Sequence, residues 1–124
     1  MAGNDIRLIA RLRIAPNHLE AFKAGVREAA DVTHQQDSVL SYEWYLNDDG
    51  TICDVLERYA DSDAFVTHIR GRVGTEILPK LREVWELEFL YVYGDLSPEA
   101  ETEFRAIAND ERFAVLRPMA GYTR

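Results

Sequence analysis

The sequence is poor in the residues that usually bind metals, form disulfides or cradle phosphates. Cysteine occurs once, at Cys53, and histidine three times, so an intramolecular disulfide is excluded and no Cys/His cluster has zinc-like spacing. The chain has no glycine-rich phosphate loop and no Gly-x-Ser-x-Gly elbow. A nucleotide or flavin cofactor therefore has no motif to bind, no metal site is expected, and the single cysteine favours a reducing compartment.

Excess positive charge and long apolar runs are also missing. Fourteen Lys and Arg stand against 22 Asp and Glu, and the net charge of −8 repels phosphate backbones and anionic lipid surfaces. Asp5 and three arginines interrupt the N-terminal stretch MAGNDIRLIARLRI, which excludes a signal peptide and a membrane span there. We expect a cytoplasmic protein with no nucleic-acid or membrane partner, folded as one domain over residues 1–124.

The hydrophobic pattern predicts alternating strands and helices. Residues 6–14 alternate with period two and predict a strand, whereas apolar positions three or four apart predict a helix after Pro16, with Asn17 and Glu20 as a capping pair. NDDG marks the turn of a hairpin, and Asp61 or Ser62 is expected to cap the next helix. The remaining predicted elements are strands at 39–46, 51–60 and 84–94, helices at 61–71 and 97–108, and a C-terminal arm that is either a strand or extended chain.

This order, β-α-β-β-α-β, is that of the ferredoxin-like split βαβ motif. We expect an α+β fold over residues 6–94, with an antiparallel sheet covered by helices on one face and a C-terminal helix and arm at 95–124. If side chains alternate strictly along each strand, each of two aromatic-rich stripes lies on one face of the sheet. These stripes are Leu40, Tyr42, Trp44 and Leu46 in one strand and Trp85, Leu87, Phe89, Tyr91 and Tyr93 in another.

Both faces of every predicted strand carry apolar or aromatic residues. Since helices of one chain cover only one face, we expect the other to pack against a second copy, giving a homodimer. The apolar residues after Gly94 are expected to serve assembly rather than chemistry. The strand-one arginines Arg7, Arg11 and Arg13 are expected to pair with acidic residues of a neighbouring strand or subunit, with anion binding as the alternative.

Three stretches resemble the antibiotic biosynthesis monooxygenase family of dimeric α+β barrel proteins. They are LIARLRIAPNHLEAFK, SVLSYEWYLNDDG and VLERYADSDAFVTHI, and the resemblance spans about residues 6 to 94. In the last stretch a Glu-x-Tyr-x-Asp step leads to an Ala-x-x-x-His helix. Glu57, Tyr59, Asp61, Ala64 and His68 match that pattern.

The resemblance implies an oxygenase without metal or prosthetic group, in which an electron-rich substrate is deprotonated and itself reduces dioxygen. The expected activity is oxidation of a quinol or polycyclic phenol, so the ligand is a small aromatic molecule. The alternative is a dimeric barrel without activity that binds a small ligand in a stress or regulatory role, because fold alone does not fix function.

His68 is the expected catalytic residue, a neutral imidazole with a pKa near neutrality that takes a proton from the substrate. The competing reading is a histidine that only packs against the sheet. Tyr42, Trp44 and Phe65 are expected to line the cavity, although a Tyr-Trp stripe is also typical of a core. Glu57 is either a structural partner or a group that orients the ligand.

Overall fold

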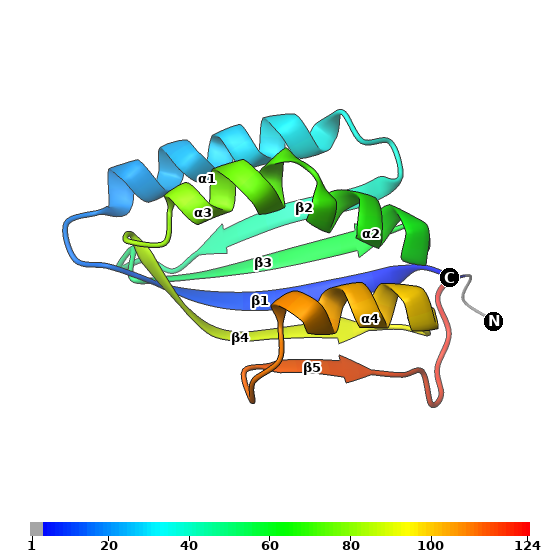
Figure 1. The fold of residues 1–124 in the computed structure, drawn as a ribbon. Helices are drawn as coiled ribbons and strands as arrows, with labels where there is room; N and C mark the ends of the chain where they lie inside the picture. Colours follow the sequence, from blue (N-terminus) through cyan, green and yellow to red (C-terminus); the bar gives the residue numbers. More distant parts are fainter. Residues whose placement is uncertain (1–3) are drawn as a thin grey trace.

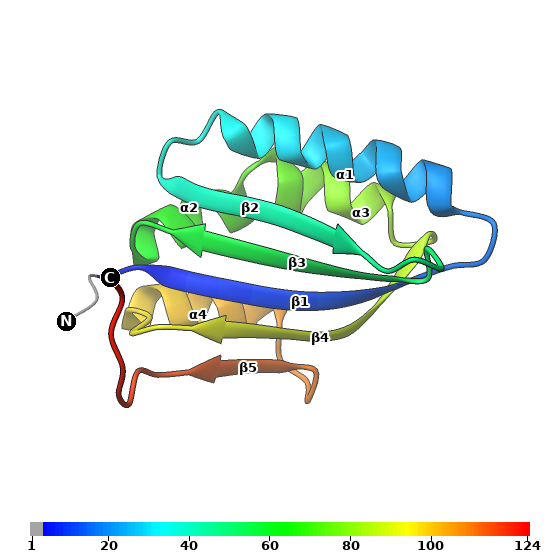
Figure 2. The ribbon, with the colours of Figure 1, turned by 180° about the vertical axis from the view of Figure 1, so that it is seen from behind.

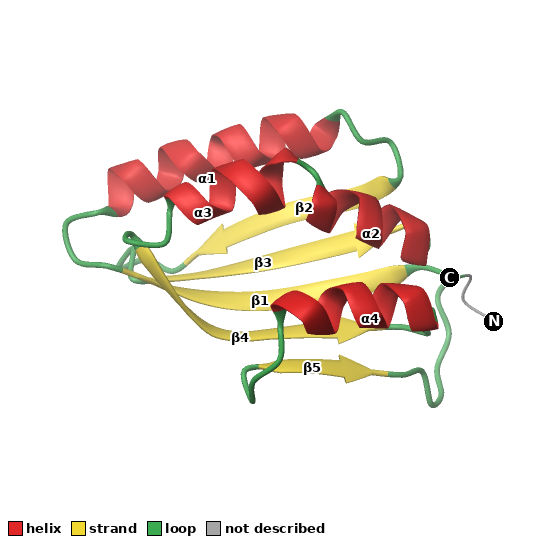
Figure 3. Cartoon of the chain, viewed as in Figure 1, coloured by secondary structure: helices red, strands yellow, loops and turns green. Residues whose placement is uncertain are grey.

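The computed structural model describes residues 4–124, which form one mixed sheet with helices on a single face (Figures 1 and 3). The strands run in the order β2-β3-β1-β4-β5, with β1 in the centre. The elements in chain order are β1 (Ile6–Ile14), α1 (Leu19–His34), β2 (Val39–Leu46), β3 (Ile52–Tyr59), α2 (Ser62–Arg70), the π-helix η1 (Val73–Ile77), α3 (Leu78–Lys80), β4 (Trp85–Tyr93), α4 (Pro98–Ile107) and β5 (Phe113–Leu116).

The first four strands confirm the ferredoxin-like arrangement. β1 pairs with β3 and β4, and β2 pairs with β3, all antiparallel. β5 pairs in parallel with β4, which α4 makes possible by crossing back over the sheet. The antiparallel sheet predicted for residues 6–94 is confirmed, and the C-terminal arm, expected as either a strand or extended chain, begins as a fifth strand.

The core lies between the sheet and the helices. Ile6, Leu8, Ala10, Leu12 and Ile14 of β1 are all at most 5% exposed, whereas the intervening residues face the helix-free side. Figure 2, seen from behind, shows no helix over that side of the sheet. The period-two pattern of β1 thus predicts its buried face correctly.

α4 and β5 complete this chain's own core. Phe104 is 2% exposed and stacks edge-on with Phe65 and Phe113, and Val115 packs on the same cluster. The expectation that the apolar residues after Gly94 serve assembly is wrong for these side chains. Beyond β5, Met119 and Tyr122 remain 98% and 76% exposed.

Two β-bulges change which side chains share a face. The register shift between Val39 and Ser41 places Val39 opposite Tyr59 and against the core, whereas Leu40 is 50% exposed. A second shift, opposite Arg11 and Leu12, lies at Glu88 of β4. Trp85 and Leu87 therefore face the helices, while Phe89, Tyr91 and Tyr93 face the open side, so neither predicted stripe stays on one face.

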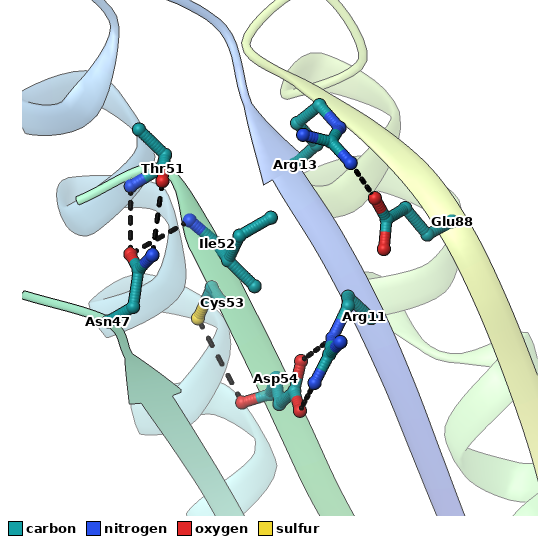
Figure 4. A network of polar contacts seen from close by, with 8 residues as sticks. All are labelled: Arg11, Arg13, Asn47, Thr51, Ile52, Cys53, Asp54 and Glu88. Carbon is teal, nitrogen blue, oxygen red and sulfur yellow. Dashed lines mark hydrogen bonds and ion pairs between the residues drawn. The ribbon is translucent and has the colours of Figure 1, made fainter. Parts of the chain in front are cut away.

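Side-chain caps fix two of the turns and helix starts. Asp61 accepts a hydrogen bond from the Ala64 backbone N–H at 2.8 Å, as expected for the cap of α2. In the β2–β3 turn, the Asn47 side-chain oxygen accepts from Thr51 and Ile52, and Gly50 adopts a φ of 70° (Figure 4). The predicted Asn17–Glu20 cap of α1 is absent: His18 occupies the cap position without a side-chain bond.

Candidate active site

Side chains from β2, β3 and α2 form a polar cluster inside the layer between helices and sheet. Tyr42 lies on β2, Glu57 and Tyr59 lie on β3, and His68 lies on α2. The His68 ring centre is 5.5 Å from that of Tyr42 and 5.4 Å from that of Tyr59. Four hydrogen-bonding side chains thus meet where the rest of the layer is apolar.

The local sequence explains how these groups meet. Glu57 and Tyr59 are two residues apart on one strand and therefore point to the same face, and Tyr42 lies directly opposite Glu57 in the register. In α2, the buried residues are Ala64, Phe65 and His68, spaced so that one face of the helix turns to the sheet. The Asp61 cap fixes where that helix starts, and with it the position of His68.

Glu57 and His68 form a buried pair. Their side chains are each 9% exposed, and His68 Nε2 lies 3.8 Å from Glu57 Oε1. The Tyr59 hydroxyl donates a hydrogen bond to the same carboxylate oxygen. At 3.8 Å the His68 and Glu57 side chains are close neighbours but not hydrogen-bonded, and the one hydrogen bond to this carboxylate oxygen among the described residues comes from Tyr59.

Burial shifts the pKa values of the two partners in opposite directions. Loss of solvation raises the pKa of Glu57 from 4.5 to about 7, although the Tyr59 hydrogen bond opposes the rise. Loss of solvation also lowers the pKa of His68 from 6.5 to about 4. The imidazole is neutral at pH 7, as expected, but its pKa is not near neutrality. The carboxyl group of Glu57 is the one that titrates there.

The two tyrosines remain protonated donors. Burial, together with the neighbouring Glu57 carboxylate, raises the pKa of Tyr42 well above its usual range, and the same two causes raise the pKa of Tyr59. Tyr42 and Tyr59 therefore supply O–H groups rather than phenolates at neutral pH.

Two buried polar groups beside the cluster make no hydrogen bond of good geometry with the described residues. These are Trp44 Nε1 and Thr33 Oγ1, and Thr33 is only 3% exposed. The Trp44 ring lies 5.7 Å from that of Tyr42. Thr33 and Trp44 both interact with the Tyr42 hydroxyl and oppose the rise in its pKa. A third buried group, Trp85 Nε1, also has no hydrogen bond among the described residues and lies outside the cluster.

The structure brings most of the predicted site residues together. Tyr42, Glu57 and His68 are in the cluster, and Trp44 borders it. Phe65 lies behind Tyr59, 5.4 Å away between ring centres, and belongs to the core. Sequence reasoning missed Tyr59 and Thr33 as site residues. The sequence could have indicated Tyr59, because a residue two positions after Glu57 on the same strand points to the same face of the sheet.

Other features of the described chain do not compete with this cluster. Two surface grooves of about 610 and 650 Å³ run along α4, lined by mixed charged and small residues such as Arg105 and Glu103, and they do not reach His68. Within residues 4–124, no three His, Cys, Asp or Glu side chains gather as metal ligands. No helix in that part of the chain is long and apolar enough to cross a membrane.

The ferredoxin-like α+β fold defines the structural class, and comparison defines the family. The family model described as antibiotic biosynthesis monooxygenase matches residues 5–72. The chain belongs to this family. The matched region runs from β1 through α2 and therefore contains the whole polar cluster. No curated protein matches the chain.

Solved structures share the fold at low sequence identity. MupZ from Pseudomonas fluorescens is 19% identical, with a TM-score of 0.80 over 98% of this chain and 96% of that one. A conserved protein from Methanosarcina mazei Go1 is 25% identical, with a TM-score of 0.66 over 72% and 90%. SnoaB from Streptomyces nogalater, described as a cofactor-independent oxygenase, is 13% identical, with a TM-score of 0.65 over 73% and 91%. The MupZ match therefore extends over the C-terminal elements.

Proposed function

We propose that the chain is a monooxygenase that oxidises a quinol or polycyclic phenol with dioxygen and uses no metal or prosthetic group. The observation that carries the proposal is the buried Glu57–His68 pair, a proton acceptor enclosed among hydrogen-bond donors. Family membership supports the reaction type, and a solved relative of the same fold, SnoaB, is described as a cofactor-independent oxygenase. The substrate class is the one that the resemblance to this family implies, and its phenolic hydroxyl is a group from which the pair can take a proton.

The first step is proton removal from the substrate hydroxyl. His68 meets the hydroxyl and accepts its proton on one ring nitrogen, while its other nitrogen gives a proton to Glu57 Oε1, which faces it at 3.8 Å. The imidazole returns to its neutral form, as its lowered pKa favours, and the proton rests on a carboxyl group whose pKa is about 7. His68 is thus the catalytic residue, and Glu57 is the acceptor behind it.

The deprotonated ring then reduces dioxygen. For a quinol, the ring loses four electrons and gains one oxygen atom, so that quinol plus dioxygen yields a hydroxyquinone plus water. Dioxygen accepts those four electrons, one of its atoms entering the product and the other leaving as water. Tyr42 and Trp44 provide O–H and N–H groups for the oxygen atoms of the aromatic ligand, and their rings provide its apolar wall.

The experiment is oxygen uptake with a panel of quinols and polycyclic phenols, in the presence of a metal chelator. At least one substrate is expected to give uptake matched by quinone formation, and His68→Gln should lower the rate by roughly 100-fold or more, the usual scale of general acid–base catalysis. His34→Gln, at the exposed end of α1, is the matched control. Unchanged turnover in His68→Gln would contradict the proposal.

The alternative, a dimeric barrel that binds without turnover, makes a different prediction for the same panel. A ligand would change the fluorescence of Trp44, which borders the cluster, without oxygen uptake. In Trp44→Phe the remaining fluorescence comes from Trp85, the second tryptophan, so loss of the ligand-induced change in this variant assigns the change to Trp44. Binding without uptake across the panel would replace the oxygenase by this alternative.

We further propose that the chain is a homodimer paired through the helix-free face of the sheet. This face exposes large apolar side chains from several strands, among them Tyr45 at 53% and Leu56 at 37%. Such a surface is typical of a protein interface rather than of a solvated sheet face.

A further inference from the structure

The last residues of the chain form an apolar arm that contacts little of its own chain. Residues 118–124 follow β5, and Met119 and Tyr122 are 98% and 76% exposed. Among the described residues, the one hydrogen bond of this segment joins Arg124 to Tyr122, within the arm itself. A side chain at Gly121 would meet no atom within 4 Å. The arm is therefore apolar but unpacked.

The base of the arm is held firmly. Arg117 donates to the Leu96 carbonyl at 3.1 Å and pairs with Asp95 and Glu101. The Gly94 N–H donates to the Leu116 carbonyl at 3.0 Å. Figure 2 shows the arm leaving β5 and running past the end of β4 toward the start of β1, along the border of the helix-free face. The contacts of Arg117 and Gly94 thus fix the direction in which the arm leaves β5, and the arm lies next to the helix-free face.

The strand arginines of the helix-free face are paired with acidic residues of the same chain. Arg11 binds Asp54 through two bonds of 2.8 and 2.9 Å, and Arg13 pairs with Glu88 (Figure 4). Arg7 and Arg58 both contact Asp5. Glu43 and Glu86 lie on the same face without a salt bridge among the described residues, so the face carries a small part of the net charge of −8 and repulsion between two copies across it is weak.

The size of the face also fits a second copy. Strands of eight or nine residues are about 26–30 Å long and lie about 4.8 Å apart, so the four long strands cover roughly 500–600 Å² in projection. A specific interface buries about 800 Å² per partner. The exposed Tyr122 can bury roughly 150–250 Å² more, so the arm would add to the area buried between two copies.

From these observations we infer that the arm, residues 118–124, packs on a second copy of this chain and clamps the pair of sheets together. The inference rests on the proposed homodimer and adds the element that strengthens it. Met119 and Tyr122 are the two side chains that bury themselves on the partner.

The test is sedimentation equilibrium of the full chain from nanomolar to about 100 µM. The wild type is expected at twice its 14.2 kDa mass. The double variant Met119→Ser/Tyr122→Ser should raise the dimer Kd at least tenfold with an unchanged far-UV spectrum. Ile107→Ser, which is 67% exposed on α4 and lies on the helix side, is the matched control and should leave Kd unchanged.

Leu56→Asp and Tyr45→Asp, on the helix-free face, should give monomers and identify the surface involved. A double arm variant with the wild-type Kd, while the face variants dissociate, would overturn the role of the arm and leave the dimer. A wild type of 14 kDa at 100 µM would overturn both the dimer and the role of the arm. Neither readout uses turnover, so failure of the proposed oxygenase activity would leave these results unaltered.

Discussion

At the scale of single residues, Glu57 is the group that distinguishes this layer from an ordinary core. A carboxyl group whose side chain is 9% exposed, with one hydrogen-bond donor and a neutral histidine beside it, is costly to ionise. Its pKa of about 7 follows from that cost. This pKa suits the role proposed for Glu57, since general bases work best when their pKa lies close to the working pH.

The Tyr59 hydroxyl is expected to tune this carboxyl group. Its hydrogen bond lowers the pKa of Glu57, so Tyr59→Phe should raise that pKa further above 7 and move the rising limb of the pH–rate profile to higher pH. The measurement is kcat/KM against pH for both proteins. Tyr93→Phe, on the helix-free face, is the control. A profile that stays in place in Tyr59→Phe would show that this bond does not set the pKa.

Glu57 should also leave a signature in stability. Its pKa rises from 4.5 in the unfolded chain to about 7 in the fold, so between these pH values the folded state holds a proton that the unfolded state has lost. The contribution of Glu57 to the free energy of unfolding therefore falls as the pH rises from about 4.5 to about 7, and it is least favourable above pH 7. The difference in unfolding free energy between Glu57→Gln and the wild type should therefore favour the variant more at pH 8 than at pH 4, by up to about 3 kcal/mol.

Urea unfolding of wild type and Glu57→Gln at pH 4, 6 and 8 measures this difference. The lowered pKa of His68 acts in the opposite sense, making stability rise between about pH 4 and 6.5, and it is common to both proteins. A stability difference between the two proteins that is independent of pH would mean that Glu57 titrates normally.

At the scale of elements, the sequence predicts what periodicity and capping determine. The alternation of β1 and the Asp61 cap of α2 both hold in the structure. Faces of β2 and β4 could not be predicted, because a bulge adds one residue and flips every position beyond it. The Glu57–His68 pair was also hidden, since it depends on how α2 packs across β3 and no spacing along the chain encodes that packing.

The Asp61 cap should contribute measurably to α2. Asp61→Ala removes an acceptor for the Ala64 N–H and is expected to lower the free energy of unfolding by about 1 kcal/mol. Asp63→Ala removes the same charge two residues after the cap, within the first turn of the helix, and leaves the cap in place, so it serves as the control. Equal losses in the two variants, measured by urea unfolding, would assign the effect to charge alone.

At the scale of the whole molecule, helices cover one face of the sheet, and the other face has no helix over it. The C-terminal α4 and β5 close the helix side, with Phe104 between Phe65 and Phe113. The sequence marked this segment as apolar but not which apolar residues fold back, because that choice depends on the crossover to β5. The helix-free side exposes Tyr45 and Leu56 and is the face that we propose pairs with a second copy.

The fold itself should depend on β5 but not on the arm. Phe113→Ala removes a ring that packs edge-on against Phe104 and should cost about 2–4 kcal/mol of unfolding free energy. Met119→Ala, at a side chain that is 98% exposed, should stay within about 0.5 kcal/mol at concentrations where the protein is monomeric. Comparable losses in both variants would place the arm in the core after all.

The most direct test of the Glu57–His68 proton acceptor is the pH dependence of oxygen uptake, compared between wild type and Glu57→Gln on one quinol. The wild-type kcat/KM is expected to rise through a pKa of about 7 to a plateau, because the carboxyl group must be ionised to accept the proton. Glu57→Gln should lose roughly 100-fold or more and show no such limb, whereas Glu43→Gln, exposed on β2, should match the wild type. A Glu57→Gln enzyme with the wild-type rate and the same limb near pH 7 would contradict the account.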